Sequence, residues 1–322
     1  MSHEITVRDD GKAEMAFTGP RTAIWHGLGQ ELQVDATIEQ WITAAGMDFE
    51  VFESMVKFND FSGQDHIYPA RKALFRSDTL APLSIVGEDF NIVQPGDVME
   101  FFRDLVKTND MKLSTAGTLF GGKRFWALAE MGQECNIVKG DTVKQHLLLT
   151  TAVDGSMATA AKVVATRVVC NNTLTLAMSE KSNTLARVTH KKVLDADQLK
   201  LDLGLIDKQW ITMMDNLRAL ANVKMDAKKT MRFFEDLYYD PKKTAEKQSL
   251  STLRMVAKIS ELAFSGSGSD LSKGTAWGAL NGATEYFTHG TGRRDQSSQF
   301  WESYHGTLAA QKTAVYRALV AA

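Results

Sequence analysis

The sequence contains few cysteines, only Cys135 and Cys170 among 322 residues. Two cysteines cannot form the dense disulfide framework of a small secreted domain, and they fit a reducing cytosol. No segment holds the roughly 20 unbroken apolar residues that a membrane span requires. The first residues, Met1 to Asp10, lack the basic start and the apolar run of a signal peptide. We therefore expect a cytoplasmic protein that is neither exported nor inserted into a membrane.

Complete metal and nucleotide motifs are also lacking. No Cys/His spacing resembles a zinc site, and no His-Glu-x-x-His segment occurs. Gly117 to Lys123 match the spacing of a phosphate-binding loop, but Arg124 stands where that loop needs Ser or Thr to hold Mg²⁺. The flanking pattern is strand, turn, strand, whereas a phosphate loop precedes a helix. We therefore expect no metal, no cofactor and no enzymatic activity.

One enzymatic alternative stays open, a nucleophile and base formed by Cys170 with His190 or His146, or a site around His26. Cys170 follows Val168 and Val169, and an apolar run of this kind favours a buried structural cysteine. The segment around His26 is interpreted as an arm that packs onto the core.

Charge is unevenly distributed along the chain, although the formal net charge is −2. Residues 1–100 carry −10, residues 101–200 carry +5 and residues 201–322 carry +3. An acidic first third repels a polyanion, and a basic middle attracts one. Nucleic-acid binding by overall charge is therefore excluded, but binding by a local basic face is not.

Hydrophobic periodicity predicts three consecutive segments. Residues 1–36 are expected to form an N-terminal arm, residues 37–193 a β-rich α+β core, and residues 194–322 a helical C-terminal region. The fold class is therefore α+β, an antiparallel sheet core with packed helices followed by helices.

Within the core, helical spacing predicts a helix over residues 37–54 and another that begins at Pro95. A further helix is expected after Asn171 and Asn172, which resemble a helix cap. Alternation and the turn signals Gly121-Gly122 and Asp154-Gly155 predict antiparallel strands. These strands are expected over residues 111–119, 123–131, 142–153 and 157–169.

Basic residues are the more informative candidates for a site. On a sheet covered by helices they could line a groove that follows a phosphate backbone, and nearby aromatic side chains could stack on bases. A solvated charged surface and a buried aromatic core are the alternatives. The candidate cations are Arg71, Lys72, Arg76, Lys123, Arg124, Lys162, Arg167, Arg187 and Lys191, and the candidate aromatic residues are Phe75, Phe125 and Trp126.

Several segments together resemble a known family. They are residues 25–29, 82–87, 93–95, 116–124, 147–156, 167–174 and 274–281, and Arg-Val-Val-Cys-Asn-Asn-Thr-Leu at 167–174 is the most specific. From about residue 24 to residue 290 the chain resembles the phage- and plasmid-related proteins grouped as domain of unknown function 932. That resemblance implies a mobile genetic element in a bacterial host cell.

A topological resemblance suggests an activity. The order helix, three-stranded antiparallel sheet, helix over residues 97–185 is similar to the core of the phage single-strand annealing proteins, the RecT, Redβ and Erf group. It implies ATP-independent binding and annealing of single-stranded DNA, in recombination or in maintenance of a phage or plasmid. It also implies a homo-oligomer, ring-shaped in some members, with a phage exonuclease or a host single-strand-binding protein as partner and no membrane.

In this interpretation phosphates are held by Lys123, Arg124, Lys162 and Arg167, with Arg187 and Lys191 as outer contacts. The apolar residues on both faces of the strand over residues 123–131 support self-association, since one subunit alone is expected to leave one face uncovered.

The alternative is a protein-binding module of a mobile element that inhibits or recruits a host nuclease or defence factor. The acidic first third of the chain would then mimic DNA, through residues that include Asp48, Glu50, Glu53 and Asp60.

Overall fold

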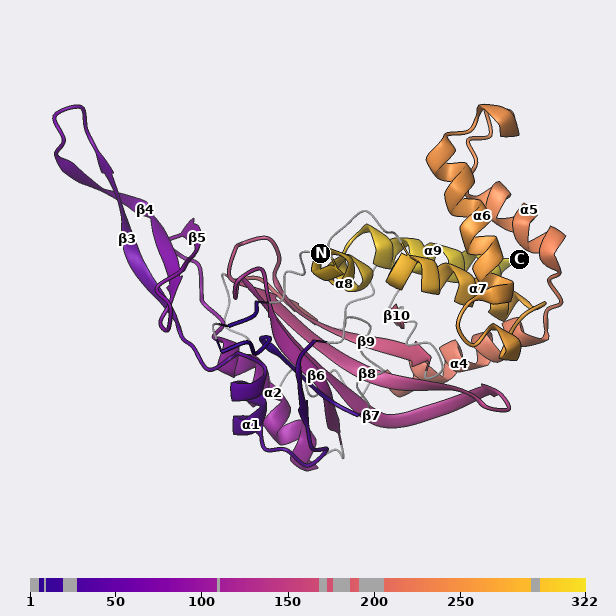
Figure 1. Ribbon diagram of the computed structural model, residues 1–322, viewed down its shortest axis with the longest axis horizontal. Helices are drawn as coiled ribbons and strands as arrows, with labels where there is room; N and C mark the ends of the chain where they lie inside the picture. The colour runs from indigo at the N-terminus through magenta and orange to yellow at the C-terminus, as the bar shows by residue number, and fades with distance from the viewer. Residues whose placement is uncertain are drawn as a thin grey trace. The chain divides into compact units, whose positions relative to one another are not determined.

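The structure, a computed structural model, describes the chain apart from residues 1–5, 9, 20–27, 109–110, 168–172, 176–185, 191–205 and 291–295. It contains one mixed and one antiparallel sheet, and the described chain after their last strand is helical (Figure 1). The α+β class and the helical C-terminal region are therefore confirmed. In the described part of the chain, no helix is long and apolar enough to cross a membrane.

The larger sheet has the strand order β10-β9-β8-β7-β6-β1-β2, and β11 also pairs with β9. Its strand β1 pairs antiparallel with β6 and parallel with β2, so the sheet is mixed. Its strands are β1 Met15–Thr18, β2 Gln30–Leu32, β6 Lys112–Leu119, β7 Arg124–Val138, β8 Asp141–Ala152, β9 Thr159–Arg167, β10 Thr173–Thr175 and β11 Ala186–Val188. The strands predicted from residue 111 to residue 169 are thus confirmed.

Two local predictions about this sheet are wrong. The N-terminal segment is not a separate arm throughout, because β1 is a sheet strand whose Ala16 and Phe17 are buried. The segment after Asn172 begins with strand β10, not with a helix. Thr173 lies opposite Thr166 of β9, and this backbone pairing holds the segment extended.

The chain divides into two compact units. Unit 1 comprises Met1–Gly132, His146–Val163 and Ser182–Leu205, and unit 2 comprises Gln133–Gln145, Val164–Lys181 and Ile206–Ala322. The units differ from the three consecutive segments expected from the sequence, because β7, β8 and β9 each contribute residues to both.

Residues 123–131 do not leave an apolar face of the sheet uncovered, so they give no support for self-association. Phe125, Ala127 and Ala129 on one face of β7 are buried, and so are Trp126 and Leu128 on the other. The chain therefore covers both faces of this strand by itself.

The first helix is shorter than the pattern predicts. Helix α1, Ile38–Ala44, begins with a capping box formed by Thr37 and Gln40. It ends before Gly46, which adopts a positive φ of 71°. A Cβ at Gly46 would lie 2.5 Å from Cβ of Glu14, the residue before β1, so a glycine is needed where the chain turns. The predicted helix from Pro95 is confirmed as α2, Pro95–Thr108.

In unit 2 the helices are α4 Ile206–Asn222, α5 Ala227–Tyr238, α6 Leu250–Ser265, α7 Ala276–Glu285, α8 Gln296–His305 and α9 Thr307–Ala321, with short turns η2 Ala245–Lys247, η3 Ser269–Leu271 and η4 Tyr286–Gly290. Helix α7 is buried from Ala276 to Thr284. A Cβ at Gly282 would lie 2.5 Å from the backbone nitrogen of Ala263 and 2.6 Å from the carbonyl oxygen of Ile259. The absence of a side chain at Gly282 therefore lets α7 pack directly against α6.

We expect Gly282→Ala to destabilise unit 2 by about 1–3 kcal/mol, because the added methyl group meets backbone that cannot move aside. The matched control is Gly96→Ala in α2, where an added Cβ meets nothing within 4 Å. Urea unfolding followed by circular dichroism measures both changes. Equal midpoints for the two variants would show that the α6–α7 contact tolerates a side chain.

Candidate functional site

The smaller sheet has the order β3-β4-β5, with β3 Val51–Asn59, β4 Asp65–Arg76 and β5 Pro82–Gly87. Strands β3 and β4 form a long hairpin, residues 51–76, which we call the β-arm. In Figure 1 it extends as a paired ribbon away from α1 and α2 of the same unit. The sequence pattern assigned the start of β3 to a helix and did not predict this hairpin.

Asp60 organises the turn of the β-arm. Its carboxylate accepts hydrogen bonds from the backbone N–H of Ser62 at 2.8 Å and of Gln64 at 3.0 Å, and from the Ser62 hydroxyl at 2.6 Å. His66 contacts the same carboxylate at 2.8 Å. The hydrogen bonds from Ser62 and then His66 lower the pKa of Asp60. A carboxylate used in this way fixes the turn and leaves Phe61 fully exposed at its tip.

Large apolar side chains on the β-arm and on β5 are exposed to solvent. They do not contribute to the core of unit 1, although Phe, Met and Ile are among the residues that proteins bury most often. Phe52 packs edge-on against Phe75 at 5.9 Å, and Phe58 stacks on His66 at 5.4 Å, so the aromatic rings are ordered. The exposed residues are Phe52, Met55, Phe58, Phe61, Ile67, Tyr68 and Ile85, with exposed fractions from 45% upward.

The base of the β-arm is fixed by a buried ion pair. Arg76 donates to both carboxylate oxygens of Glu14, at 2.7 and 3.1 Å, and to both oxygens of Asp78, at 2.7 and 2.9 Å. Thr118 donates to Glu14 at 2.7 Å, and the guanidinium group lies 3.8 Å from the ring centre of Phe49. Burial alone lowers the pKa of Arg76, but the hydrogen bonds to Asp78 and Glu14 outweigh it and raise the pKa. Arg76 is therefore a structural cation, not a phosphate contact.

Arg167 is likewise buried, at 2% exposure. It donates two hydrogen bonds of 2.6 Å to the carboxylate of Asp141, and Trp277 donates a third to that carboxylate at 2.8 Å. Arg167 also donates to the carbonyl oxygen of Gly268 at 3.0 Å. Within unit 2 this network joins the sheet to α7, so Arg167 is not available to a polyanion.

Of the remaining predicted contacts in the larger sheet and its turn, Lys162 is buried, Arg124 is paired and Lys123 is half-buried. Lys162 is 8% exposed. Arg124 forms an ion pair with Asp154 at 3.3 Å across the hairpin turns, and Lys123 beside it is half-buried. Phe125 and Trp126 are buried, so neither can stack on a base. Because Arg76, Lys162 and Arg167 are buried, these three cations do not line an open groove.

On the β-arm, Arg71 is exposed, and Lys72 forms an ion pair with Glu53 at 2.8 Å. The backbone of Arg187 lies in β11, but its side chain lies outside the described residues, as does all of Lys191.

Of the candidates for catalysis, the structure describes His190 and His146. Both ring nitrogens of His190 face backbone carbonyl oxygens, of Asn91 at 3.0 Å and of Met157 at 3.1 Å, so neither faces a nucleophile. His146 is buried, while Cys170 and His26 lie outside the described residues. Among the residues that the structure describes, no cluster of His, Cys, Asp and Glu could hold a metal ion.

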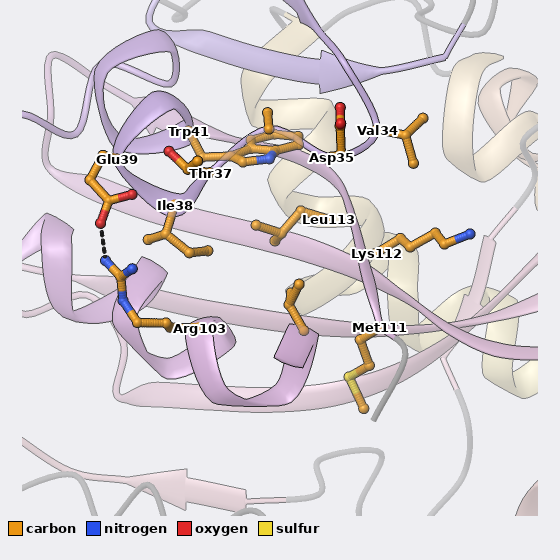
Figure 2. A pocket seen from close by; sticks show the side chains of 12 residues that line it. Val34, Asp35, Thr37, Ile38, Glu39, Trp41, Arg103, Met111, Lys112 and Leu113 are labelled. Atoms are coloured by element: carbon orange, nitrogen blue, oxygen red, sulfur yellow. Dashed lines mark hydrogen bonds and ion pairs between the residues drawn. The ribbon is translucent and has the colours of Figure 1, made fainter. Parts of the chain in front are cut away.

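A cavity of about 490 Å³ lies between α1, α2 and the start of β6 (Figure 2). Ile38, Trp41 and Leu113 form its apolar part. At its edge Arg103 donates to Glu39 at 2.7 Å, and the hydrogen bonds from the backbone of Glu39 and from Arg103 lower the pKa of Glu39 to about 2. The charged groups at this edge neutralise each other, and no nucleophile with a base lines the cavity.

A known family matches residues 82–305, and its description is "Domain of unknown function (DUF932)". The chain belongs to this family. No curated protein and no solved structure matches the chain.

The DUF932 segment contains the Arg167 network and ends in α8. Arg167 is the first residue of the segment 167–174, and Trp277 lies in the segment 274–281. Both segments carry the family resemblance, and Asp141 accepts hydrogen bonds from both residues. The β-arm lies before the matched segment. The matched segment therefore includes the Arg167 network and does not include the exposed hairpin.

Replacing Arg76 with Ala should cost about 2–4 kcal/mol of stability, because the buried Glu14 would keep only the half-buried Arg8, at 3.2 Å, as its counter-charge. Arg71→Ala removes the same charge from an exposed position of the same strand, and we expect it to change stability by no more than about 0.5 kcal/mol. Thermal or denaturant unfolding compares the two variants. A small effect of Arg76→Ala would contradict the structural role of the pair.

Proposed function

We propose that this chain is a non-catalytic protein-binding module that contacts its partner through the tip of the β-arm. The observation that carries the proposal is the exposure of Phe58, Phe61, Ile67 and Tyr68 on a hairpin with a fixed base. Contiguous exposed apolar residues on a soluble surface are typical of interaction sites. Aromatic side chains in particular supply much of the binding energy at protein interfaces.

The charge of the β-arm supports a protein partner. Residues 51–76 contain four cations and three carboxylates, so the hairpin is close to neutral. A polyanion is held by clusters of unpaired cations. Here Arg76 is buried and Lys72 is paired with Glu53. We therefore expect hydrophobic contact to contribute more binding energy at this surface than charge does.

Three of the four acidic residues named as a DNA mimic make contacts within the chain. Asp48 contacts Arg8, Glu53 contacts Lys72, and Asp60 holds the turn. We therefore assign recognition to the aromatic tip and not to a copy of DNA charge. Inhibition or recruitment of a nuclease or defence factor remains one form that this binding could take.

A second candidate is binding and annealing of single-stranded DNA, in the manner of the RecT, Redβ and Erf group and in the service of a mobile element. What favours it is the exposed Arg71, which shares a face of the smaller sheet with Phe75 and lies on the strand that carries Tyr68. Exposed aromatic rings beside a guanidinium group can stack on bases. Helix α2 precedes the antiparallel strands β6 to β9, but strand β10 follows them where that similarity requires a helix.

A photo-crosslinking side chain in place of Phe61 tests the proposal in the cells that produce the protein. We expect a covalent adduct with a different protein, identified by mass spectrometry. The control position is Leu250, which is also exposed but lies in unit 2, and it should give no such adduct. An adduct that nuclease digestion removes would support the second candidate, and the absence of any adduct would contradict both.

The double variant Phe61→Ser/Tyr68→Ser should lose the partner and keep its stability, because exposed side chains contribute little to folding. Ile211→Ser/Val223→Ser alters two exposed apolar residues of unit 2 and is expected to retain the partner. Loss of the partner in both variants would indicate nonspecific hydrophobic binding.

A further inference from the structure

Strand β3 has a strand partner on one side only among the described residues, since the order of the smaller sheet is β3-β4-β5. Its burial pattern is exposed at nearly every position after Val51. The edge of such a strand presents unpaired backbone N–H and C=O groups, which are a template for another strand.

The direction of these backbone groups can be assigned from Val51. Its N–H and C=O point away from β4, because both bond the side-chain amide of Gln94, at 2.8 and 3.1 Å. Alternation along the strand then directs the N–H and C=O of Glu53, Met55 and Lys57 to the same free edge. The irregularity in the hairpin does not interrupt this edge. Met55 pairs with Lys72 and Lys57 pairs with Ile67, so the additional residues of the bulge lie in β4 and β3 stays regular.

We propose that this edge pairs with the β3 edge of a second copy of the chain, antiparallel and centred on Met55. Two-fold pairing in this register places Glu53 of each copy opposite Lys57 of the other. Registers centred on Glu53 or Lys57 would place like charges opposite each other, which is destabilising. Registers centred on Ser54 or Val56 place both Glu53 and Lys57 opposite uncharged residues. Charge complementarity therefore selects a single register.

The same register also matches the apolar side chains. Phe52 of each copy lies opposite Phe58 of the other, on the face of the sheet where Phe52 already packs against Phe75. Cross-strand aromatic pairs and opposite-charge pairs both stabilise antiparallel strands. Glu53, Met55 and Lys57 would each exchange backbone hydrogen bonds across the axis. Gln94 occupies the edge at Val51 and limits the pairing to residues 52–58.

An interface of this kind is isologous and closes at two copies. It therefore predicts a dimer, not the ring that the resemblance to annealing proteins implied. The proposal uses the edge of β3 over residues 52–58, whereas Phe61, Ile67 and Tyr68 of the proposed partner site lie outside that edge. Phe58 belongs to both surfaces, so variants at Phe61 and Tyr68 distinguish the two.

The test is a charge exchange read by sedimentation velocity on the full chain. The unaltered protein should be a dimer at about 100 µM, and Glu53→Lys or Lys57→Glu should each weaken the dimer at least about tenfold through like-charge contacts. An equimolar mixture of the two variants should recover the dimer, because in the mixed pair each side chain at position 53 again lies opposite one of the other sign at position 57. The intrachain contacts of Glu53 with Lys72 and of Lys57 with Asp65 cannot produce this recovery.

The matched control pair is Lys258→Glu and Glu261→Lys, which alters an exposed ion pair of α6. Neither should change the association state. A monomeric unaltered protein, or a mixture of Glu53→Lys and Lys57→Glu that stays monomeric, would overturn the proposal. The variant Phe61→Ser/Tyr68→Ser should remain dimeric, which separates this interface from partner binding at the tip.

Discussion

The buried contact between Arg76 and Glu14 is the interaction on which the β-arm depends. It joins the end of β4 to the chain just before β1, and Thr118 connects the same carboxylate to β6. A buried ion pair is favourable only when further hydrogen bonds satisfy both groups, and here Asp78 and Thr118 supply them. An exposed hairpin with such a base is held in place before it meets a partner, which lowers the entropic cost of binding.

The same use of a cation recurs in unit 2, where Arg167 and Asp141 connect the sheet to Trp277. Basic residues that looked like a surface in the sequence are thus internal connections in both units. Because Arg76 and Arg167 are buried, the exposed apolar side chains of the β-arm are the feature of the described surface that most needs a partner. This is why the proposed function rests on hydrophobic contact and strand pairing, with electrostatics selecting the register.

Local signals in the sequence predict the larger sheet well. The Gly121-Gly122 and Asp154-Gly155 turns and the alternation between them lead to β6, β7, β8 and β9. Ion pairs between residues far apart in the sequence cannot be predicted from local patterns. Nothing near Arg167 indicates Asp141, 26 residues earlier, and nothing near Arg76 indicates Glu14, 62 residues earlier. The apolar spacing of α1 continues past Gly46, so only the close approach of Glu14 shows why the helix ends and β3 begins.

The strand pairing is tested by hydrogen exchange of residues 52–58 at low and high protein concentration, because exchange reports on the backbone groups of the free edge. We expect these residues to exchange more slowly as the concentration rises, while exchange in the turn over residues 60–64 stays unchanged. Exchange in residues 52–58 that is the same at every concentration would refute the pairing.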